Sequence, residues 1–279
     1  MKPAPFAYKK ARSLDEALGL IAREPEAKLL AGGQSLIPAL NMRLSGPPLL
    51  IDINAVEGLS RIETKDGSIS IGALVRHAQA ERSEIVANYA PLLARALPHI
   101  AHPAIRNRGS IGGSLAYADP AAELPACLVA LGGEVIARGP AGERVIAADD
   151  FFRGLFETAL AAGEMVTGIR VPSAEAGMRV GFAELTRRHG DYALVGLAAT
   201  AGANGKHLRD VRLAYFGVGN TPLRQPRAER ALAEGDIDAA VASLDLDPPD
   251  DVQATGAVRK HLSGVLLRRV AAQLMDARA

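Results

Sequence analysis

Two glycine-rich segments carry the residue types that could bind an anion. The first reads Ala31-Gly32-Gly33-Gln34-Ser35 and follows a short apolar run that ends at Leu30. Glycine has no Cβ and reaches positive φ, so two in succession let the backbone turn sharply and approach a ligand closely. The amide N–H groups and the Ser35 hydroxyl then form a concave set of donors. A helix that begins at Leu36 would add positive potential at the same place.

A second segment with similar chemistry lies farther along the chain and reads Arg106-Asn107-Arg108-Gly109-Ser110-Ile111-Gly112-Gly113-Ser114. It combines glycines with hydroxyl and guanidinium groups that donate hydrogen bonds to anions. A diphosphate has two phosphoryl groups that need donors from more than one direction, so the two segments could hold one from opposite sides. A glycine pair that only forms a turn is the alternative for each segment taken alone.

Other nucleotide-binding and catalytic motifs are incomplete. The stretch Gly217-Val218-Gly219-Asn220-Thr221-Pro222 begins like a dinucleotide fingerprint, but its sixth position is proline and no crossover helix with a downstream acid follows. Gly205-Lys206 is followed by His207 rather than Ser or Thr, which excludes a P-loop. No Gly-x-Ser-x-Gly sequence occurs, so the usual signal of a serine hydrolase is missing.

The composition limits the classes of partner. The chain has 279 residues, 48% hydrophobic and 23% charged, a balance typical of globular proteins. Its 32 basic and 31 acidic side chains give a formal charge of +1, too small an excess to neutralise nucleic-acid phosphates. The longest uncharged apolar stretch, Tyr192 to Asn204, is too short for a membrane span. The N-terminus shows no apolar leader, so we expect a cytoplasmic protein that has no membrane span and does not bind nucleic acid.

A single cysteine, Cys127, restricts the redox chemistry of the chain. One thiol cannot form an internal disulfide, ligate an iron–sulfur cluster or make a structural zinc site. Cys127 lies among Leu124, Leu128, Val129 and Leu131, so we expect a buried and inert thiol. Any redox reaction must therefore use an organic cofactor or metals that another chain carries.

The elements that position the glycine-rich segments follow from capping, periodicity and turn signals. Ser13 and Glu16 have the spacing of a capping box ahead of a first helix, which Pro25 ends. Asp66-Gly67 predicts a hairpin between strands at 61–65 and 68–72. The other predicted strands span 28–31, 49–53, 134–138, 144–148 and 166–171, and the next predicted helices span 36–44, 76–87, 91–100 and 120–131.

The pattern changes near residues 173–177, where we place a domain boundary. Strand-like runs follow at 179–186, 192–203 and 207–217, with Asn204-Gly205 as the hairpin turn between the last two. The tail from Gln225 is helical, with two short helices and a long one from about Val252 to Met275. Strands followed by helices indicate an α+β domain at the C-terminal end.

Polar residues outside the glycine-rich segments have structural explanations. His99 and His102 stand three apart, but no third metal ligand is near, so we expect loop histidines that order the second segment. Asp149-Asp150 indicates a helix N-cap rather than a catalytic pair. Arg187-Arg188 could reach a phosphate or a partner, or equally be solvated at a strand end. No general acid or base has an obvious partner in the sequence.

At these motifs the chain resembles the FAD-binding (medium) subunits of molybdenum hydroxylases, the group that includes aerobic carbon monoxide dehydrogenase and bacterial xanthine dehydrogenase. The likeness covers essentially the whole chain. Besides the two glycine-rich segments, its motifs are Asp119-Pro120-Ala121-Ala122-Glu123-Leu124-Pro125 and Arg187-Arg188-His189-Gly190-Asp191-Tyr192-Ala193. Gln34 and Ser110 stand where many members have His and Thr, and both keep a hydrogen-bonding group.

The resemblance implies an α+β chain with a PCMH-type FAD-binding fold, similar to that of vanillyl-alcohol oxidase. This FAD-binding domain would span residues 1–173 as two α/β subdomains, about 1–55 and 56–173. A smaller C-terminal α+β domain at 174–279, of the carbon monoxide dehydrogenase flavoprotein type, would contain a three-stranded antiparallel sheet with helices.

The resemblance also implies which residues contact FAD, none of them catalytic or metal-binding. Asp119 would accept hydrogen bonds from the ribityl hydroxyls, Ile100 and Ala101 would lie by the isoalloxazine ring, and Tyr192 would cover its exposed face. The two glycine-rich segments would hold the diphosphate from opposite sides. The first contributes Leu30, Ala31, Gly32, Gly33, Gln34 and Ser35, and the second contributes Ser110, Ile111, Gly112, Gly113 and Ser114.

The implied activity is electron transfer within a complex. A large subunit would oxidise the substrate at a molybdenum–pterin site, and a small subunit would pass electrons through [2Fe–2S] clusters to the FAD of this chain. The FAD would reduce NAD⁺, a quinone or O₂, in a dimer of heterotrimers. A stand-alone FAD-dependent oxidoreductase that acts directly on a small organic substrate is the alternative, although only Asp191 and Tyr192 could serve it as acid or base. A non-catalytic nucleotide-binding protein is a second alternative.

Overall fold

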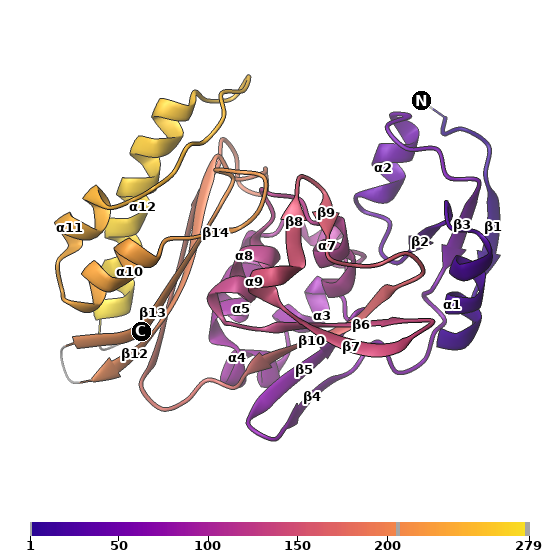
Figure 1. Ribbon diagram of the computed structural model, residues 1–279, viewed down its shortest axis with the longest axis horizontal. Helices are drawn as coiled ribbons and strands as arrows, with labels where there is room; N and C mark the ends of the chain where they lie inside the picture. Colours follow the sequence, from indigo (N-terminus) through magenta and orange to yellow (C-terminus); the bar gives the residue numbers. More distant parts are fainter. Residues whose placement is uncertain (1, 205–206, 277–279) are drawn as a thin grey trace.

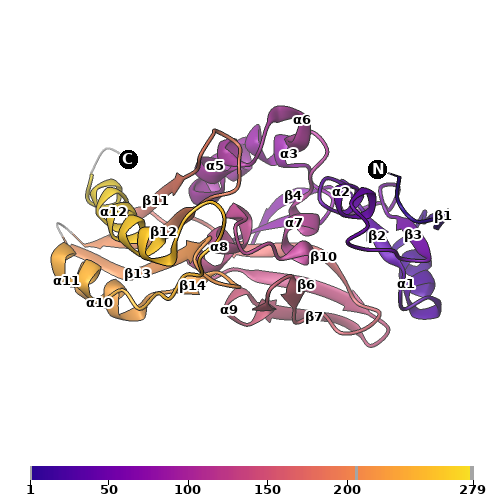
Figure 2. The same ribbon diagram turned by 90° about the horizontal axis from the view of Figure 1, so that it is seen from above.

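The computed structural model describes residues 2–204 and 207–276, and the chain extends along one axis (Figure 1). Three blocks follow one another along that axis in both views, with the N-terminal strands at one end and the C-terminal helices at the other (Figures 1 and 2). Within the described residues, none of the helices has the length and apolar character needed to cross a membrane.

The N-terminal block is a small parallel sheet whose middle strand is the last of the three in sequence. The predicted cap of its first helix is confirmed, because Ser13 Oγ accepts the Glu16 N–H at 3.1 Å and Glu16 accepts the Arg12 N–H at 2.8 Å. In the sheet order β1-β3-β2, the strands are β1 (Ala7–Lys10), β3 (Leu49–Asp52) and β2 (Lys28–Leu30), and the helices are α1 (Leu14–Arg23) and α2 (Leu36–Asn41).

An antiparallel sheet of five strands forms the middle block, in the order β4-β5-β10-β6-β7. The predicted turn between its first two strands is confirmed, since Asp66 and Gly67 have φ of 49° and 71°. Positive φ at both central residues is typical of a type I′ hairpin turn. The strands are β4 (Ile62–Lys65), β5 (Ser68–Gly72), β6 (Glu134–Gly139), β7 (Gly142–Ala147) and β10 (Met165–Pro172).

Short helices lie over this sheet and carry the second glycine-rich segment (Figure 1). The single helix predicted over 76–87 is wrong, because Ser83 Oγ accepts the Val86 N–H at 3.3 Å and starts a new helix. The helices are α3 (His77–Glu81), α4 (Glu84–Tyr89), α5 (Pro91–Ala96), the 3-10 turn η1 (Leu97–His99), α6 (Pro103–Arg106), α7 (Ile111–Tyr117), α8 (Glu123–Ala130) and α9 (Ala148–Phe151).

The segment after β7 agrees with the prediction in part. A helix begins there and has Asp149 and Asp150 in its first turn, as predicted, but the N-cap is Ala147, which makes no side-chain hydrogen bond. A small hairpin that the sequence did not predict follows, formed by β8 (Phe152–Gly154) and β9 (Glu157–Thr158). Its turn holds Phe156 at φ 56°, with the ring edge-on to Tyr117 at 5.1 Å between centroids.

The C-terminal block is an antiparallel sheet of four strands, in the order β11-β12-β13-β14. Sequence reasoning predicted three strands and missed the two-residue strand β14, which pairs with β13. Strand β12 begins at Val195, so Tyr192 lies in the preceding loop and not in the strand as predicted. The predicted turn at Asn204-Gly205 includes a residue outside the described part of the chain. The strands are β11 (Met178–Leu185), β12 (Val195–Asn204), β13 (His207–Phe216) and β14 (Leu223–Arg224).

Helices cover the outer face of this sheet (Figure 1). The long helix begins at Gly256, where Thr255 Oγ1 accepts the Val258 N–H at 3.3 Å, rather than at Val252 as predicted. Three helices follow the sheet in the described residues: α10 (Pro226–Ala233), α11 (Ile237–Ala242) and α12 (Gly256–Met275).

Both faces of the C-terminal sheet are buried. Alternate residues of a strand point to opposite faces, so Ala198, Ala214 and Phe216 join the core of the middle block. Leu197 and Leu213 point the other way and join a second core with the outer helices. The sheet therefore fixes the C-terminal helices to the middle block.

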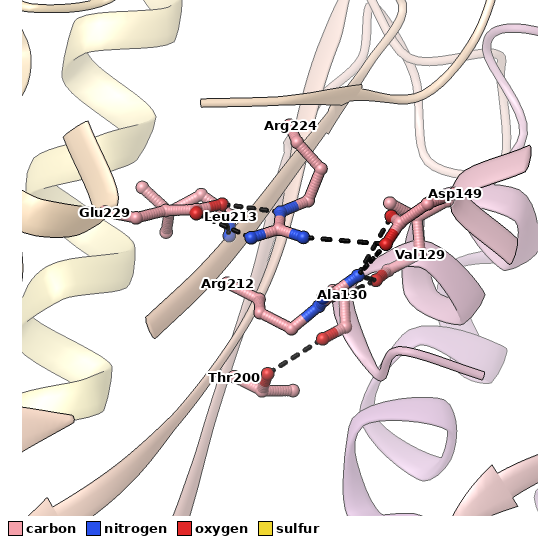
Figure 3. Close-up of polar contacts among 8 residues, drawn as sticks. All are labelled: Val129, Ala130, Asp149, Thr200, Arg212, Leu213, Arg224 and Glu229. Carbon is pink, nitrogen blue, oxygen red and sulfur yellow. Dashed lines mark hydrogen bonds and ion pairs between the residues drawn. The ribbon is translucent and has the colours of Figure 1, made fainter. Parts of the chain in front are cut away.

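Polar contacts reinforce this packing (Figure 3). Arg212 of β13 donates from Nη2 to the Val129 carbonyl at 2.7 Å, and the same atom lies 2.8 Å from Asp149 Oδ2. Thr200 Oγ1 donates to the Ala130 carbonyl at 2.8 Å. These carbonyls belong to the last turn of α8, whose oxygens have no partner within the helix. The C-terminal sheet thus supplies the donors that this helix end needs.

Replacing Arg212 with Met should lower the free energy of unfolding by about 1–3 kcal/mol, because the buried Val129 carbonyl and Asp149 both lose a charged donor. The carbonyl then keeps the Gly132 N–H at 3.1 Å, and Asp149 keeps the more distant Arg224 at 3.7 Å. Urea unfolding followed by circular dichroism measures the change. Arg209→Met removes an exposed guanidinium from the same strand and should change the free energy by less than about 0.5 kcal/mol. Equal effects of the two substitutions would contradict this role of Arg212.

Candidate functional site

The first glycine-rich segment is a loop with unused backbone donors. It connects β2 to α2, and Gly33 has φ 74°, a left-handed conformation that favours glycine. Within residues 2–204 and 207–276, the N–H groups of Gly32, Gly33, Gln34 and Ser35 donate to no other group. Gln34 folds back, with Nε2 3.1 Å from the Gly32 carbonyl. The loop therefore presents a row of free amide donors, the arrangement that binds anions.

The two glycine-rich segments touch at Gly32. A Cβ on Gly32 would lie 2.2 Å from the Arg108 carbonyl oxygen and 3.0 Å from Gly109 Cα, so no side chain fits there. A Cβ on Gly113 would lie 4.0 Å from the Ala31 Cβ. The segments are far apart in sequence, yet they pack backbone against backbone in the structure.

The second segment is the start of a helix rather than a second open loop. Ser110 caps α7, and its Oγ accepts the Gly113 N–H at 3.3 Å. The N–H groups of residues 111–114 all donate within the protein, two of them to carbonyls of the segment that follows β5. This segment therefore does not repeat the row of free amides found in the first. In residues 110–114, the remaining donors are the hydroxyls of Ser110 and Ser114.

Asn54 and Arg76, which sequence reasoning missed, connect the two segments. Asn54 follows β3, and its Nδ2 donates to the Ala31 carbonyl at 2.9 Å. Arg76 donates from Nη1 to the Arg108 carbonyl at 2.6 Å and from Nη2 to Asn54 Oδ1. A continuous chain of hydrogen bonds thus runs from the first segment to the second.

A signal for Asn54 existed in the sequence. Strands β2 and β3 are parallel and adjacent, so the residues that follow them lie at the same sheet edge. Asn54, two positions after Asp52, therefore faces the glycine loop. Asp52 Oδ1 accepts the Asn54 N–H at 2.8 Å. Arg76 has no comparable signal, because only the tertiary fold brings it to Arg108.

Ile100 and Ala101 form a turn that two other segments hold. Arg106 donates to both of their carbonyls, at 3.0 and 3.1 Å, and Glu81 anchors Arg106 at 2.8 Å. Gly190 of the C-terminal block packs on this turn, since a Cβ there would lie 2.9 Å from the Ala101 carbonyl. The predicted neighbours of the flavin ring therefore sit where the middle and C-terminal blocks meet.

Asp119 and Tyr192 lie within electrostatic reach of each other. Asp119 accepts the Ala121 N–H at 2.9 Å, and burial raises the pKa of its carboxyl. Partial burial, helped by the charge of Asp119, raises the pKa of Tyr192 to about 12. With this raised pKa, the phenol is neutral at physiological pH. Tyr192 is also 60% exposed, so its ring lies at the surface.

Helix α7 links the two ends of the candidate site. Its seven residues rise about 10 Å, from the Ser110 cap to Asp119 just beyond its end. The first group of predicted residues lies at the start of α7 and consists of Leu30, Ala31, Gly32, Gly33, Gln34, Ser35, Ser110, Ile111, Gly112, Gly113 and Ser114. The second group lies toward the other end and consists of Ile100, Ala101, Asp119 and Tyr192.

Three further residues have contacts that bear on the sequence predictions. His99 does not order the second segment as predicted, because its Nδ1 lies 3.4 Å from Glu184 Oε1 of the C-terminal block. Cys127 is buried as predicted, and burial raises the pKa of its thiol. Arg188 pairs with Asp191 at 3.0 Å. Among the residues that the structure describes, no group of three or more His, Cys, Asp and Glu could hold a metal ion.

Replacing Gly32 with Ala should force the two segments apart and lower the free energy of unfolding by about 1–3 kcal/mol, the usual range for overpacking. Gly46→Ala is the control in the same block, because a Cβ there would meet its nearest atom at 3.9 Å. Urea unfolding of both variants measures the difference. If Gly32→Ala proves as stable as Gly46→Ala, the contact with Arg108 is not tight.

His77 supports the second segment and makes stability depend on pH. A Cβ on Gly109 would lie 2.9 Å from the His77 Nδ1, and neither ring nitrogen has a hydrogen-bond partner in the described part of the chain. Burial lowers the pKa of His77 to about 4. Between about pH 6.5 and 4 the unfolded imidazole is protonated but the folded one is not, so stability falls as pH falls, by up to about 3 kcal/mol.

His77→Leu should remove this share of the acid destabilisation. The free energy of unfolding, measured at about pH 7.5 and about pH 4.5, should change less with pH in His77→Leu than in the parent chain. His261→Leu removes an exposed imidazole and serves as control. The same pH dependence in all three proteins would refute the assignment.

Comparisons with known proteins extend over nearly the whole chain. The model of a family described as "FAD binding domain in molybdopterin dehydrogenase" matches residues 4–174. The model of another, described as "CO dehydrogenase flavoprotein C-terminal domain", matches residues 181–274. The 6-hydroxypseudooxynicotine dehydrogenase complex subunit alpha of Paenarthrobacter nicotinovorans is 42% identical, over 99% of this chain and 96% of that protein.

Solved structures show the same similarity. Carbon monoxide dehydrogenase from Hydrogenophaga pseudoflava, in a form lacking the Mo-pyranopterin moiety, has a chain with a TM-score of 0.96 and 34% identity, and 98% of both chains is covered. A chain of quinoline 2-oxidoreductase from Pseudomonas putida 86 gives a TM-score of 0.94 and 35% identity, covering 99% of this chain and 98% of that one. On these matches, the chain belongs to the FAD-binding medium subunits of the molybdenum hydroxylase family.

Proposed function

We propose that this chain holds FAD across its two glycine-rich segments and passes electrons from the [2Fe–2S] clusters of a partner subunit through it to an external acceptor. The observation that carries the proposal is the contact at Gly32, where the two segments meet backbone against backbone. Beside that contact lies a row of amide N–H groups that no group of the described chain accepts. Family membership identifies the cofactor as FAD.

The donors near this contact suit a diphosphate. The first segment offers the N–H groups of residues 32–35, and the second offers the hydroxyls of Ser110 and Ser114. Burial lowers the pKa of Arg76, and the nearby charge of Arg108 lowers it further. Because the two guanidinium groups repel each other, a diphosphate bound there would gain from both charges and relieve their repulsion.

The other end of the site suits the ribityl chain and the ring. Asp119 would accept hydrogen bonds from ribityl hydroxyls. Helix α7 separates Asp119 from the glycine-rich segments by about 10 Å, a length that suits an extended cofactor. Ile100 and Ala101 would flank the isoalloxazine ring and Tyr192 would shield its open face. Bound FAD supplies the ability to accept electrons singly and deliver them in pairs. The protein orients the ring and controls which acceptor reaches it.

The metal centres must belong to other chains. One buried cysteine cannot ligate a [2Fe–2S] cluster. Relatives are named as a complex subunit and a medium chain, so we assign molybdenum–pterin and substrate oxidation to a large subunit and the clusters to a small one. A stand-alone FAD-dependent oxidoreductase is not favoured by these names.

The proposal includes the domain division and the assembly. We place an FAD-binding domain at 1–173, with subdomains of about 1–55 and 56–173, and a C-terminal domain at 174–279; the limits of the two family models, 4–174 and 181–274, support the boundary between the domains. We propose a dimer of heterotrimers, each with one large, one medium and one small subunit. A single unpaired thiol suits the reducing cytoplasm.

Gly113→Val should give folded but colourless protein, because the added side chain would lie between Ser110 and Ala31, at the junction of the segments. The test uses the complex made with its large and small subunits and measures flavin absorbance per protein. Gly19→Val, in a helix where a Cβ has room, should keep its FAD. Ser114→Ala, a milder change, should weaken FAD binding roughly tenfold by removing one hydroxyl donor. Full FAD in both Gly113→Val and Ser114→Ala would remove the second segment from the site.

A further inference from the structure

Three titratable side chains lie together where the middle and C-terminal blocks pack. Glu123 is the first residue of α8, Glu184 is on β11, and His99 ends the turn η1. His99 Nδ1 is 3.4 Å from Glu184 Oε1, and the His99 ring packs on Phe182 at 5.0 Å between centroids. We call Glu123, Glu184 and His99 the carboxyl–histidine cluster.

Both carboxyl groups of the cluster are buried and poorly compensated. The Glu184 side chain is 6% exposed, and its Oε2 has no hydrogen-bond partner among the residues that the structure describes. Glu123 is 9% exposed and pairs with no cation among the described residues; its carboxyl accepts only its own backbone N–H. Charging a buried carboxyl group costs solvation unless a cation pairs with it. His99 pairs with Glu184, whereas Glu123 has no such partner among the described residues, so Glu123 is the carboxyl that favours its protonated form.

The charges of the cluster act on one another. Burial raises the pKa of Glu123 to about 8, the charge of Glu184 raises it further and His99 opposes the rise. The hydrogen bond with Glu184 raises the pKa of His99. Near neutral pH, Glu123 is therefore the protonated carboxyl and Glu184 is the partner of His99. Glu123 releases its proton as the pH rises past about 8.

The cluster lies next to the proposed ring site. His99 directly precedes Ile100, which would flank the isoalloxazine ring. The charge of Glu123 also reaches Tyr192, whose pKa is raised first by burial and then by Asp119, Tyr117 and Glu123. A charge at the ring site and a charge on Glu123 are therefore close enough to influence each other.

The other groups that face Glu123 add no positive charge. Asp119 adds to the rise in its pKa, and Tyr192 is neutral. Cys127, one turn further along α8, has a thiol pKa raised by burial and by both carboxyl groups. Within the described residues, no lysine or arginine contacts Glu123 or Glu184. At the ring site, Arg106 supplies one fixed positive charge. Its guanidinium group is hydrogen-bonded to the Ile100 and Ala101 carbonyls and paired with Glu81. Within the cluster itself, protonation is the way in which added negative charge can be offset.

We propose that the carboxyl–histidine cluster takes up one proton from solvent as the flavin beside it is reduced. Electrons from the partner's clusters add negative charge at the ring, and Glu123, at a pH where it is ionised, responds by forming an O–H bond with a proton from solvent. His99, with a side chain 40% exposed, connects the cluster to solvent. No protein group is oxidised or reduced, and the three residues are positioning residues that act through charge. The inference rests on the proposed ring site at Ile100 and Ala101.

Spectroelectrochemical titration of the flavin in the intact complex, from about pH 6 to about pH 9.5, tests the coupling. In the parent complex, the reduction potential should fall more steeply with pH above about 8, because reduction there takes up an extra proton. Glu123→Gln keeps the size of a neutral carboxyl and should lose the extra slope, so its potential equals that of the parent at low pH and lies above it at high pH. Glu184→Gln removes a like charge and should move the break to lower pH.

Glu143→Gln, on the exposed hairpin of β7, is the matched control and should behave as the parent. Reduced-minus-oxidised infrared spectra of the parent at about pH 8.5 should gain the carbonyl stretch of a protonated carboxyl. A Glu123→Gln curve parallel to that of the parent at every pH overturns the inference, and so does the absence of that band, whether or not the variants fold. A complex that retains no flavin would instead refute the proposed flavin site.

Discussion

The close approach of Gly32 to the Arg108 carbonyl is the constraint on which the candidate site depends. A single Cβ at position 32 would collide with that oxygen at 2.2 Å, so the two glycine-rich segments can meet only because a side chain is absent. Their contact places the N-terminal block against the start of α7, and Asn54 and Arg76 hold it there by hydrogen bonds to carbonyls on both sides. The two segments offer different donors to a ligand. The first leaves its backbone amides free. The second uses its amides for hydrogen bonds within the protein and contributes hydroxyl groups and nearby guanidinium charge.

The ring end of the site depends on a different contact, between the middle block and the C-terminal sheet. That sheet buries both faces, so it behaves as part of the core rather than as an appended module. Gly190 packs on Ala101, and Glu184 meets His99, so residues from both blocks surround the proposed ring position. The electrostatic environment of the flavin is therefore set by how well the blocks pack, and the Arg212 contacts with α8 belong to the same interface.

Local signals in the sequence predicted the local features well. The Ser13 cap, the Asp66-Gly67 turn and the burial of Cys127 each depend on a few neighbouring residues, and all three are confirmed. Family motifs singled out the residues that the fold brings to the two ends of α7. The sequence could not show that the N–H groups of residues 111–114 are already used, since their acceptors lie on another segment. Sequence reasoning also missed Arg76 and the proximity of Glu123 to Glu184. In both cases the neighbouring residues come from distant parts of the chain.

Amide hydrogen exchange with and without FAD tests the central claim most directly, because it reports on the backbone donors themselves. Exchange should slow markedly on FAD binding at residues 32–35, whose N–H groups have no acceptor in the described chain. It should change little at residues 111–114, which already donate within the protein. Unchanged exchange at 32–35 together with strong protection elsewhere would show that FAD is held by other groups, and the account of the site would be wrong.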